Sequence, residues 1–172
     1  MNKAFILLVF VATIGYSQQN QKYNFTLEQA ITFAFKYGKK IIIEEFIAGK
    51  EIAAGILNGV ALPLVHIKPQ HDMYDYECKY TPGMSSYIVP AELTPEKTNE
   101  IQEYALRMYN LFGCESYARI DFLLKENGEM VILEMNTLPG LTATSLLPKA
   151  AEKAGYPFSE LIENIVQEAA SR

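Results

Sequence analysis

Polar and apolar residues alternate most regularly between residues 117 and 124. Arg119 and Asp121 fall on one face of the strand that this alternation predicts, and the apolar residues fall on the other. A second run of strand-forming residues, 130–133, follows after Asn127-Gly128, which is a strong signal for a tight hairpin. The pattern therefore predicts two paired antiparallel strands. The apolar positions of the first strand are Ala118, Ile120, Phe122 and Leu124.

Polar residues also close the second strand, just before a hydroxyl-rich turn that starts at Pro139-Gly140. If the strand continues, Glu134 and Asn136 leave it on one face because they are two positions apart. Pairing through the hairpin then brings both close to Arg119 and Asp121. Carboxylate and amide oxygens suit a hard cation such as Mg²⁺, and an Arg beside them suits a phosphate. The pattern predicts a metal–phosphate site; the alternative is a solvated strand end with a surface ion pair.

Further strands are predicted upstream of this hairpin. Residues 40–46 have the composition of a buried strand, and 52–57 and 60–68 flank Asn58-Gly59 as a second hairpin. Residues 69–87 form an aromatic loop containing Gly and Pro, and loops of this length are usually lids or disordered segments.

Helices are predicted between and after the strands. Thr94 and Pro95 have the residue types of an N-cap and a first helical position, and Gly113 ends the helix that they open. A terminal amphipathic helix follows residues 157–159 and runs to about 170. The whole pattern predicts an α+β fold. The expected apolar stripes are Ile101, Ala105, Met108 and Phe112 in the first helix and Leu161, Ile162, Ile165 and Val166 in the second.

The first 17 residues have the order of a signal peptide: a basic start, an apolar core over 4–14 and small residues before Gln18. The apolar run is too short for a stable membrane span. The alternative is that it forms a first β-strand. A short helix is expected over 26–34, with Thr26 as its N-cap.

Composition excludes several classes of function. The net charge of −5 argues against a nucleic-acid binder, and 172 residues suffice for one domain with a core. Cys78 and Cys114 match no zinc spacing, so both are expected to be free thiols. His66 and His71 are remote from the carboxylates in the sequence and are not expected to bind a metal.

The segments 113–122 and 134–146 together resemble the C-terminal signature of D-alanine–D-alanine ligases, which belong to the ATP-grasp superfamily. Residues 44–47, 49–51 and 74–80 extend the resemblance, which runs from about Phe35 to the C-terminus. It implies the C-terminal half of an ATP-grasp fold, mostly antiparallel sheet with flanking helices. Downstream of the leader, the chain up to residue 34 resembles the start of TolC-type outer-membrane efflux proteins. The expected domains are a leader over 1–17, a helical linker and fusion junction over 18–38, and the truncated ligase domain over 39–172.

The resemblance also implies roles for individual residues. Two Mg²⁺ ions, or Mn²⁺ in their place, would bridge the phosphates of ATP, and Arg119 would stabilise the transferred phosphate and the tetrahedral intermediate. Lys79 and Tyr80 would lie on the loop that closes over the site. The remaining roles are adenine binding by Glu44, Glu45, Phe46 and Ile47; ribose binding by Glu51; metal binding by Asp121, Glu134 and Asn136; and binding of the second D-alanine by Tyr80, Gly140, Ser145 and Leu146, with Gly140 also helping to stabilise the oxyanion.

The implied reaction joins two D-alanine molecules at the expense of ATP, through an acylphosphate, for peptidoglycan and cell-wall synthesis in the cytoplasm. Tyr80 favours D-alanine over D-lactate as second substrate, and the family is usually homodimeric. The motifs that bind the first D-alanine and the lysines that hold the phosphates in this family are not found in this sequence. We therefore expect that the chain alone does not ligate D-alanine. The alternatives are an exported envelope or transport-related protein and an inert fusion fragment.

Overall fold

The computed structural model describes residues 5–8, 27–37, 42–45, 47–69 and 85–171, in two compact units, Met1–Ala48 and Gly49–Arg172. The first unit contains strand β1 (Phe5–Leu8), helix α1 (Leu27–Tyr37) and strand β2 (Ile42–Glu45). β1 pairs antiparallel with β2, with Phe5 opposite Glu45. Residues Phe5–Leu8 of the apolar start form a strand, and the signal peptide stays a prediction. The helix expected over 26–34 is present, and it continues to Tyr37.

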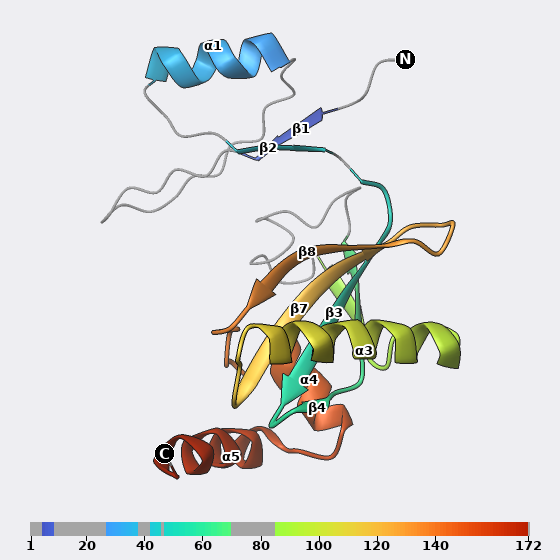
Figure 1. Ribbon diagram of the computed structural model, residues 1–172, viewed down its shortest axis with the longest axis vertical. Helices are drawn as coiled ribbons and strands as arrows, with labels where there is room; N and C mark the ends of the chain where they lie inside the picture. The colour runs from blue at the N-terminus through green and yellow to red at the C-terminus, as the bar shows by residue number, and fades with distance from the viewer. Residues whose placement is uncertain (1–4, 9–26, 38–41, 46, 70–84, 172) are drawn as a thin grey trace. The chain divides into compact units, whose positions relative to one another are not determined.

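The second unit is built on a six-stranded sheet in which every pairing is antiparallel (Figure 1). The strand order is β6-β5-β3-β7-β8, and the short β4 also pairs with β3. This sheet and its helices confirm the predicted fold class, a mostly antiparallel α+β domain. The strands are β3 (Lys50–Leu57), β4 (Val60–Ala61), β5 (Val65–Pro69), β6 (Ser85–Ile88), β7 (Tyr117–Leu124) and β8 (Met130–Asn136).

Two strand predictions need correction. The strand predicted over 60–68 is broken into β4 and β5, because Pro63 has no backbone N–H and the chain bends there. The N–H of Leu62 still donates to the carbonyl of Gly55 at 2.9 Å, so both pieces remain attached to β3. The second correction is β6, which lies inside the predicted loop and pairs with β5. The rest of that loop, 70–84, lies outside the described residues.

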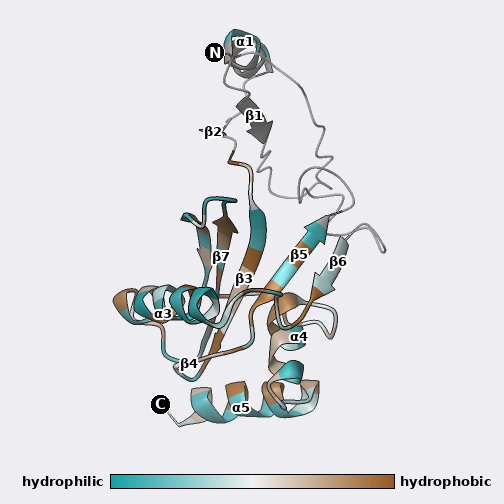
Figure 2. Cartoon of the chain, turned by 90° about the vertical axis from the view of Figure 1, so that its right-hand side faces the viewer, coloured by the Kyte–Doolittle hydropathy of each residue, from teal (hydrophilic) through white to brown (hydrophobic). Residues whose placement is uncertain are grey.

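Helices cover both faces of the sheet and make two cores (Figure 2). Helix α3 (Pro95–Leu111) covers one face, where Ile52, Ile120 and Phe122 are fully buried. Helix α4 (Leu146–Lys153) covers the opposite face and packs against helix α5 (Phe158–Ala170). The sheet is therefore buried on both faces near β3 and β7.

The helix predictions hold at the caps and fail at two apolar positions. Thr94 accepts a hydrogen bond from the N–H of Lys97 at 3.3 Å and Pro95 is the first residue of α3, as predicted. Phe112 and Val166 are 64 % and 60 % exposed, so neither belongs to a core. Phe112 lies past the last helical turn of α3, and the inward position there is taken by Tyr109, which is 3 % exposed.

The hairpin at residues 125–129 has the predicted tight turn. The N–H of Lys125 donates to the carbonyl of Glu129 at 2.9 Å, and Gly128 has a φ of 83°, which favours glycine. None of the helices in the described part of the chain has both the length and the apolar character needed to cross a membrane.

Candidate cation and phosphate site

The β7–β8 hairpin brings four polar side chains to one place on the sheet. Asp121 lies opposite Glu134, and Arg119 lies opposite Asn136. On the other side of β7, Asp121 faces Ala53. Because Ala53 belongs to the core beneath α4, the polar group lies on the α4 face of the sheet. The predicted meeting of these four residues is confirmed.

Gly55 of β3 leaves space for helix α4 on the face of the sheet that carries this site. Gly55 lies opposite Arg119 in the register of β3 and β7. A Cβ atom on Gly55 would lie 2.8 Å from Cδ1 of Leu147, a residue of α4. The absence of a side chain at Gly55 therefore lets α4 approach the sheet next to Arg119.

A bulge in β8 adjoins the two carboxylates. The register steps from Asp121 and Glu134 to Phe122 and Ile132, so Leu133 has no residue opposite it. Bulges re-aim neighbouring side chains and are common beside functional sites. Here the bulge directly follows the pair of carboxylates, and Glu134 remains exposed while Asp121 is buried.

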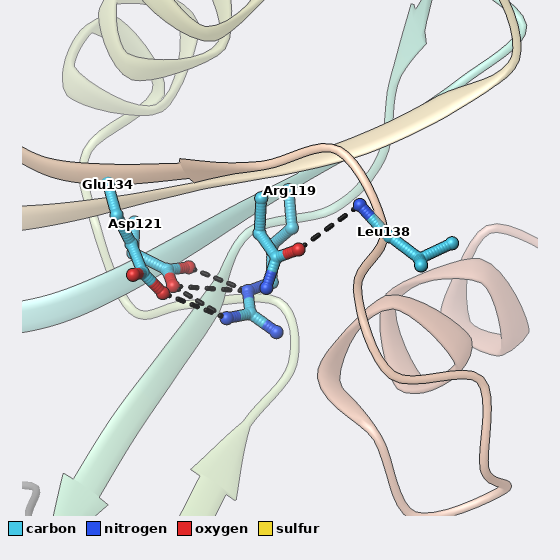
Figure 3. A network of polar contacts seen from close by, with 5 residues as sticks. Arg119, Asp121, Glu134 and Leu138 are labelled. Carbon is cyan, nitrogen blue, oxygen red and sulfur yellow. Dashed lines mark hydrogen bonds and ion pairs between the residues drawn. The ribbon is translucent and has the colours of Figure 1, made fainter. Parts of the chain in front are cut away.

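Arg119 makes a two-pronged ion pair with Asp121 (Figure 3). Its Nε donates to Oδ1 of Asp121 at 2.8 Å, and an Nη donates to Oδ2 at 2.7 Å. The same Nη lies 3.7 Å from Oε1 of Glu134. Arg119 and Asp121 are 6 % and 5 % exposed. The Arg119 guanidinium thus lies between the carboxylates of Asp121 and Glu134. Two neighbouring carboxylates need a positive charge beside them, and the guanidinium supplies it.

The side chain of Asn136 starts the following loop. Its Oδ1 accepts a hydrogen bond from the N–H of Leu138 at 3.1 Å, which forms an Asx turn (Figure 3). The turn leads away from β8 toward Pro139 and Gly140. Asn136 therefore links the ion pair to the hydroxyl-rich loop.

Ser145 organises that loop through its hydroxyl. Its Oγ accepts from the N–H of Thr142 at 3.2 Å and lies 2.8 Å from Oγ1 of Thr142. A Cβ atom on Gly140 would lie 2.9 Å from the same oxygen, so only glycine fits there without moving Ser145. The loop is closed on itself around this hydroxyl.

Ser145 is also the N-cap residue of α4, but its hydroxyl makes no cap hydrogen bond. The third helical residue is Pro148, which lacks the N–H that an N-cap side chain commonly binds. Leu146, the first helical residue, is 6 % exposed and packs in the core beneath α4. The hydroxyl of Ser145 therefore faces the loop, while the side chain of Leu146 points into the core.

The other predicted site residues fall into three groups. Glu51 lies on β3 two positions from Ala53, and so on the same face as Asp121. Glu44 and Glu45 end β2 in the first unit, with Ile47 just after it. Phe46, Lys79 and Tyr80 lie outside the described residues.

The donor set suits a hard cation. Asp121, Glu134 and Asn136 each carry a side-chain oxygen on one face of the hairpin, and the Arg119 guanidinium lies between the two carboxylates. Within the described ranges, no group of three or more His, Cys, Asp or Glu residues lies close enough together to hold a metal ion by itself.

Sequence reasoning missed α4 and two residues that shape the site, Thr142 and Gly55. The start of α4 had one signal, since Ser145 is a residue type common at N-caps. No signal in the sequence indicated that Gly55 lies opposite Arg119, because this pairing depends on a register that links residues 64 positions apart.

A family model described as "D-ala D-ala ligase C-terminus" matches residues 12–167. The D-alanine–D-alanine ligase of Methylacidiphilum infernorum is 46 % identical over 141 residues, covering 82 % of this chain and 46 % of that protein. The corresponding ligase of Syntrophotalea carbinolica is 40 % identical over 161 residues, which cover 94 % of this chain and 52 % of the relative. The chain thus spans about half the length of these relatives.

Solved structures agree with the sequence comparisons. D-alanine–D-alanine ligase from Bacillus anthracis complexed with ATP superimposes with a TM-score of 0.71 at 29 % identity, covering 97 % of this chain and 53 % of that one. The VanG D-Ala:D-Ser ligase of Enterococcus faecalis gives a TM-score of 0.65 at 31 % identity, over 83 % of this chain and 42 % of its own. The chain therefore belongs to the D-alanine–D-alanine ligase family, of which it carries the C-terminal domain.

Proposed function

We propose that residues 39–172 are the C-terminal half of a D-alanine–D-alanine ligase for peptidoglycan synthesis, and that they hold the cation and phosphate end of its active site. The observation that carries the proposal is the register that unites Arg119, Asp121, Glu134 and Asn136 in a member of this family.

ATP and Mg²⁺ are the proposed nucleotide and cation. The Bacillus anthracis relative was solved with ATP, which supports nucleotide binding by this chain. Asp121, Glu134 and Asn136 would hold two Mg²⁺, or Mn²⁺, which when bound neutralise the charge of the phosphates. Glu44, Glu45, Phe46 and Ile47 are proposed to line the adenine, and Glu51 to bind the ribose.

Arg119 is proposed to serve both chemical steps. In the first, the carboxylate of one D-alanine attacks the terminal phosphorus of ATP, and ADP leaves. In the second, the amino group of another D-alanine attacks the acylphosphate, and phosphate leaves. A guanidinium next to the phosphate stabilises the charge that develops in both steps, and the Gly140 backbone N–H would share the oxyanion.

The hydroxyl-rich loop is the proposed pocket for the second amino acid. Gly140, Ser145 and the start of α4 at Leu146 offer backbone N–H groups and a hydroxyl to a carboxylate. Lys79 and Tyr80 are proposed to close over the reacting groups and exclude water. D-alanine is the proposed second substrate; the Enterococcus faecalis relative is a D-Ala:D-Ser ligase, so D-serine is the competitor to test alongside D-lactate.

The 172-residue chain by itself is proposed not to turn over, because the motifs that bind the first D-alanine and the lysines that hold the phosphates in this family are not found in its sequence. Release of ADP from ATP, Mg²⁺ and D-alanine, followed in a coupled assay with the purified chain, should stay at the background rate. Robust turnover would contradict this proposal.

A chimera tests the ligase assignment itself. The N-terminal half of the Methylacidiphilum infernorum ligase would be joined to residues 39–172, and formation of D-alanyl-D-alanine measured. We expect the chimera to ligate D-alanine. A chimera that folds, as judged by circular dichroism, but makes no dipeptide would refute the assignment.

The leader remains a separate proposal. Its order of basic, apolar and small residues supports export with cleavage after Ser17, whereas the family resemblance implies a cytoplasmic protein that uses ATP and is usually homodimeric. The family match begins at residue 12, inside this segment. Mass spectrometry of the N-terminus from cells separates the two, because export predicts a chain that starts at Gln18. Light scattering of the purified chain tests the dimer.

A further inference from the structure

We propose that Lys50 and Lys68 form an anion site on the α3 face of the sheet, and that this site takes a phosphate group or a similar tetrahedral dianion. Asp121 lies on the opposite face, so the site is separate from the candidate cation and phosphate site. The inference therefore does not depend on the proposed ligase function.

The register of β3 and β5 places the two lysines opposite each other. Ile52 pairs with His66 in this antiparallel register, and Lys50 and Lys68 are each two positions further toward the same end. Alternation therefore puts all four side chains on one face. Since Ile52 packs in the core beneath α3, this is the α3 face. Neighbouring strands lie about 4.8 Å apart, so one tetrahedral ion can reach both ammonium groups.

The two positive charges are not compensated within the described part of the chain. Lys50 and Lys68 are both exposed, and neither has a hydrogen bond or an ion pair with another residue there. Like charges directly opposite each other destabilise a sheet. A dianion between them removes this repulsion and accepts a charge-assisted hydrogen bond from each ammonium group.

Ser86 adds a neutral donor to the two lysines. It pairs with Lys68 from β6, so it lies on the same face, and it is exposed. Its hydroxyl can donate to an oxygen of the ion that the lysines hold. The ends of β3 and β5 that carry the lysines have the hydrophilic colour (Figure 2). The site thus draws on three adjacent strands.

His66 couples this site to pH. It lies next to the lysines on the same face and is 8 % exposed, and burial, Lys50 and Lys68 lower its pKa. Glu92 raises the pKa of His66, and the residues opposite His66 on β3 and β6 are uncharged. An anion on the lysines offsets their charge and favours the protonated imidazole. By reciprocity, a protonated His66 must strengthen anion binding by the same factor.

Titration of the full 172-residue chain with sodium sulfate tests the site. Sulfate stays divalent at neutral and mildly acidic pH, and sodium chloride keeps the ionic strength constant. We expect saturable shifts of the Ser86 amide signal in nuclear magnetic resonance. Lys68→Gln should weaken sulfate binding by about ten-fold, because one charged donor is lost. Lys153→Gln removes the same charge from the exposed end of α4 and should leave the affinity unchanged.

The same titration at mildly acidic pH tests the coupling to His66. We expect sulfate to bind the wild type about five-fold more tightly than at neutral pH, because the imidazole then adds a positive charge next to the ion. His66→Gln should lose this increase while still binding sulfate at neutral pH. A pH dependence that persists in His66→Gln would overturn the coupling.

Inorganic phosphate and glycerol phosphate distinguish the two sources of the anion. Equal affinities at neutral pH would assign the site to phosphate groups on small molecules, and binding of inorganic phosphate alone would assign it to the free ion. Lys50→Gln guards against a Lys68→Gln variant that fails to fold, and it should weaken sulfate binding to a similar extent. The site itself is refuted if sodium chloride alone reproduces the shifts, or if Lys50→Gln and Lys153→Gln bind sulfate equally well.

Discussion

Asp121 and Glu134 face each other across two strands, yet their surroundings differ. Asp121 is buried with Arg119, while Glu134 is exposed beside a bulge. A buried charge needs a partner, whereas an exposed one is free to meet a ligand. The sequence predicted that the two carboxylates meet, because residue alternation and an Asn-Gly turn determine the register. It did not predict that Arg119 binds Asp121 more closely than Glu134, because this preference depends on which carboxylate is buried.

Gly140→Ala tests whether the hydroxyl of Ser145 holds the loop through the N–H of Thr142. The added methyl would lie 2.9 Å from Oγ of Ser145, so we expect it to displace the hydroxyl from the N–H of Thr142. Amide exchange at Thr142 should accelerate by about ten-fold, which corresponds to the loss of one hydrogen bond. Ser145→Ala should expose the same N–H without adding bulk. Unchanged exchange in both variants would contradict the role of Ser145.

The lowered pKa of His66 predicts how the free energy of unfolding changes with pH. Burial lowers its pKa from the usual 6.5, Lys50 and Lys68 lower it further, and Glu92 raises it. The folded state disfavours the charged imidazole. Well above pH 6.5 the imidazole is neutral in both the folded and the unfolded state, so it does not lower the free energy of unfolding. As the pH falls below 6.5, the unfolded state takes up the proton more readily, and the free energy of unfolding decreases.

Urea denaturation at neutral and mildly acidic pH measures this effect. His66→Leu should reduce the loss of stability on acidification, because the group that titrates is gone. Glu92→Gln should enlarge it, because the carboxylate that favours the charged imidazole is removed. Parallel pH curves for wild type and His66→Leu would show that His66 does not contribute.

At the scale of elements, local signals decided which predictions succeeded. Both Asn-Gly dipeptides mark real turns, and Thr94 and Pro95 begin α3 as expected. Helix α4 was missed because its eight residues contain an internal proline and too few turns for a clear period. The division of 60–68 into two strands follows from Pro63, whose effect sequence reasoning did not take into account.

The N-cap of α3 carries a measurable share of stability. Thr94→Ala removes the hydrogen bond to the N–H of Lys97, and we expect the free energy of unfolding to fall by about 1 kcal/mol. Glu103→Ala, on the exposed face of the same helix, should change it by less than about 0.5 kcal/mol. Equal effects of both substitutions in urea denaturation would argue against the cap.

At the scale of the whole molecule, both cores found among the described residues lie in the second unit. Both cores consist of residues between 52 and 161, all within Gly49–Arg172. The family model matches residues 12–167, which include these cores. The residues proposed to bind adenine lie in or next to β2 of the first unit. Which units a polypeptide forms could not be predicted from composition, because it depends on contacts between distant residues.

A fragment of residues 49–172 is therefore expected to fold alone. Its free energy of unfolding should match that of the full chain within the roughly 10–15 % uncertainty of denaturant extrapolation. A fragment that unfolds at much lower urea concentration would mean that residues 1–48 stabilise the sheet.

The carboxylates of the β7–β8 hairpin are proposed to hold the cation that ligation needs. In the chimera described above, the double substitution Asp121→Asn and Glu134→Gln keeps the size of both side chains and removes both charges. Glu163→Gln on the exposed face of α5 is the matched control. We predict that D-alanyl-D-alanine formation falls at least about a hundred-fold in the double variant and is unchanged in the control. A double variant that folds and retains its rate within a few-fold would contradict the claim.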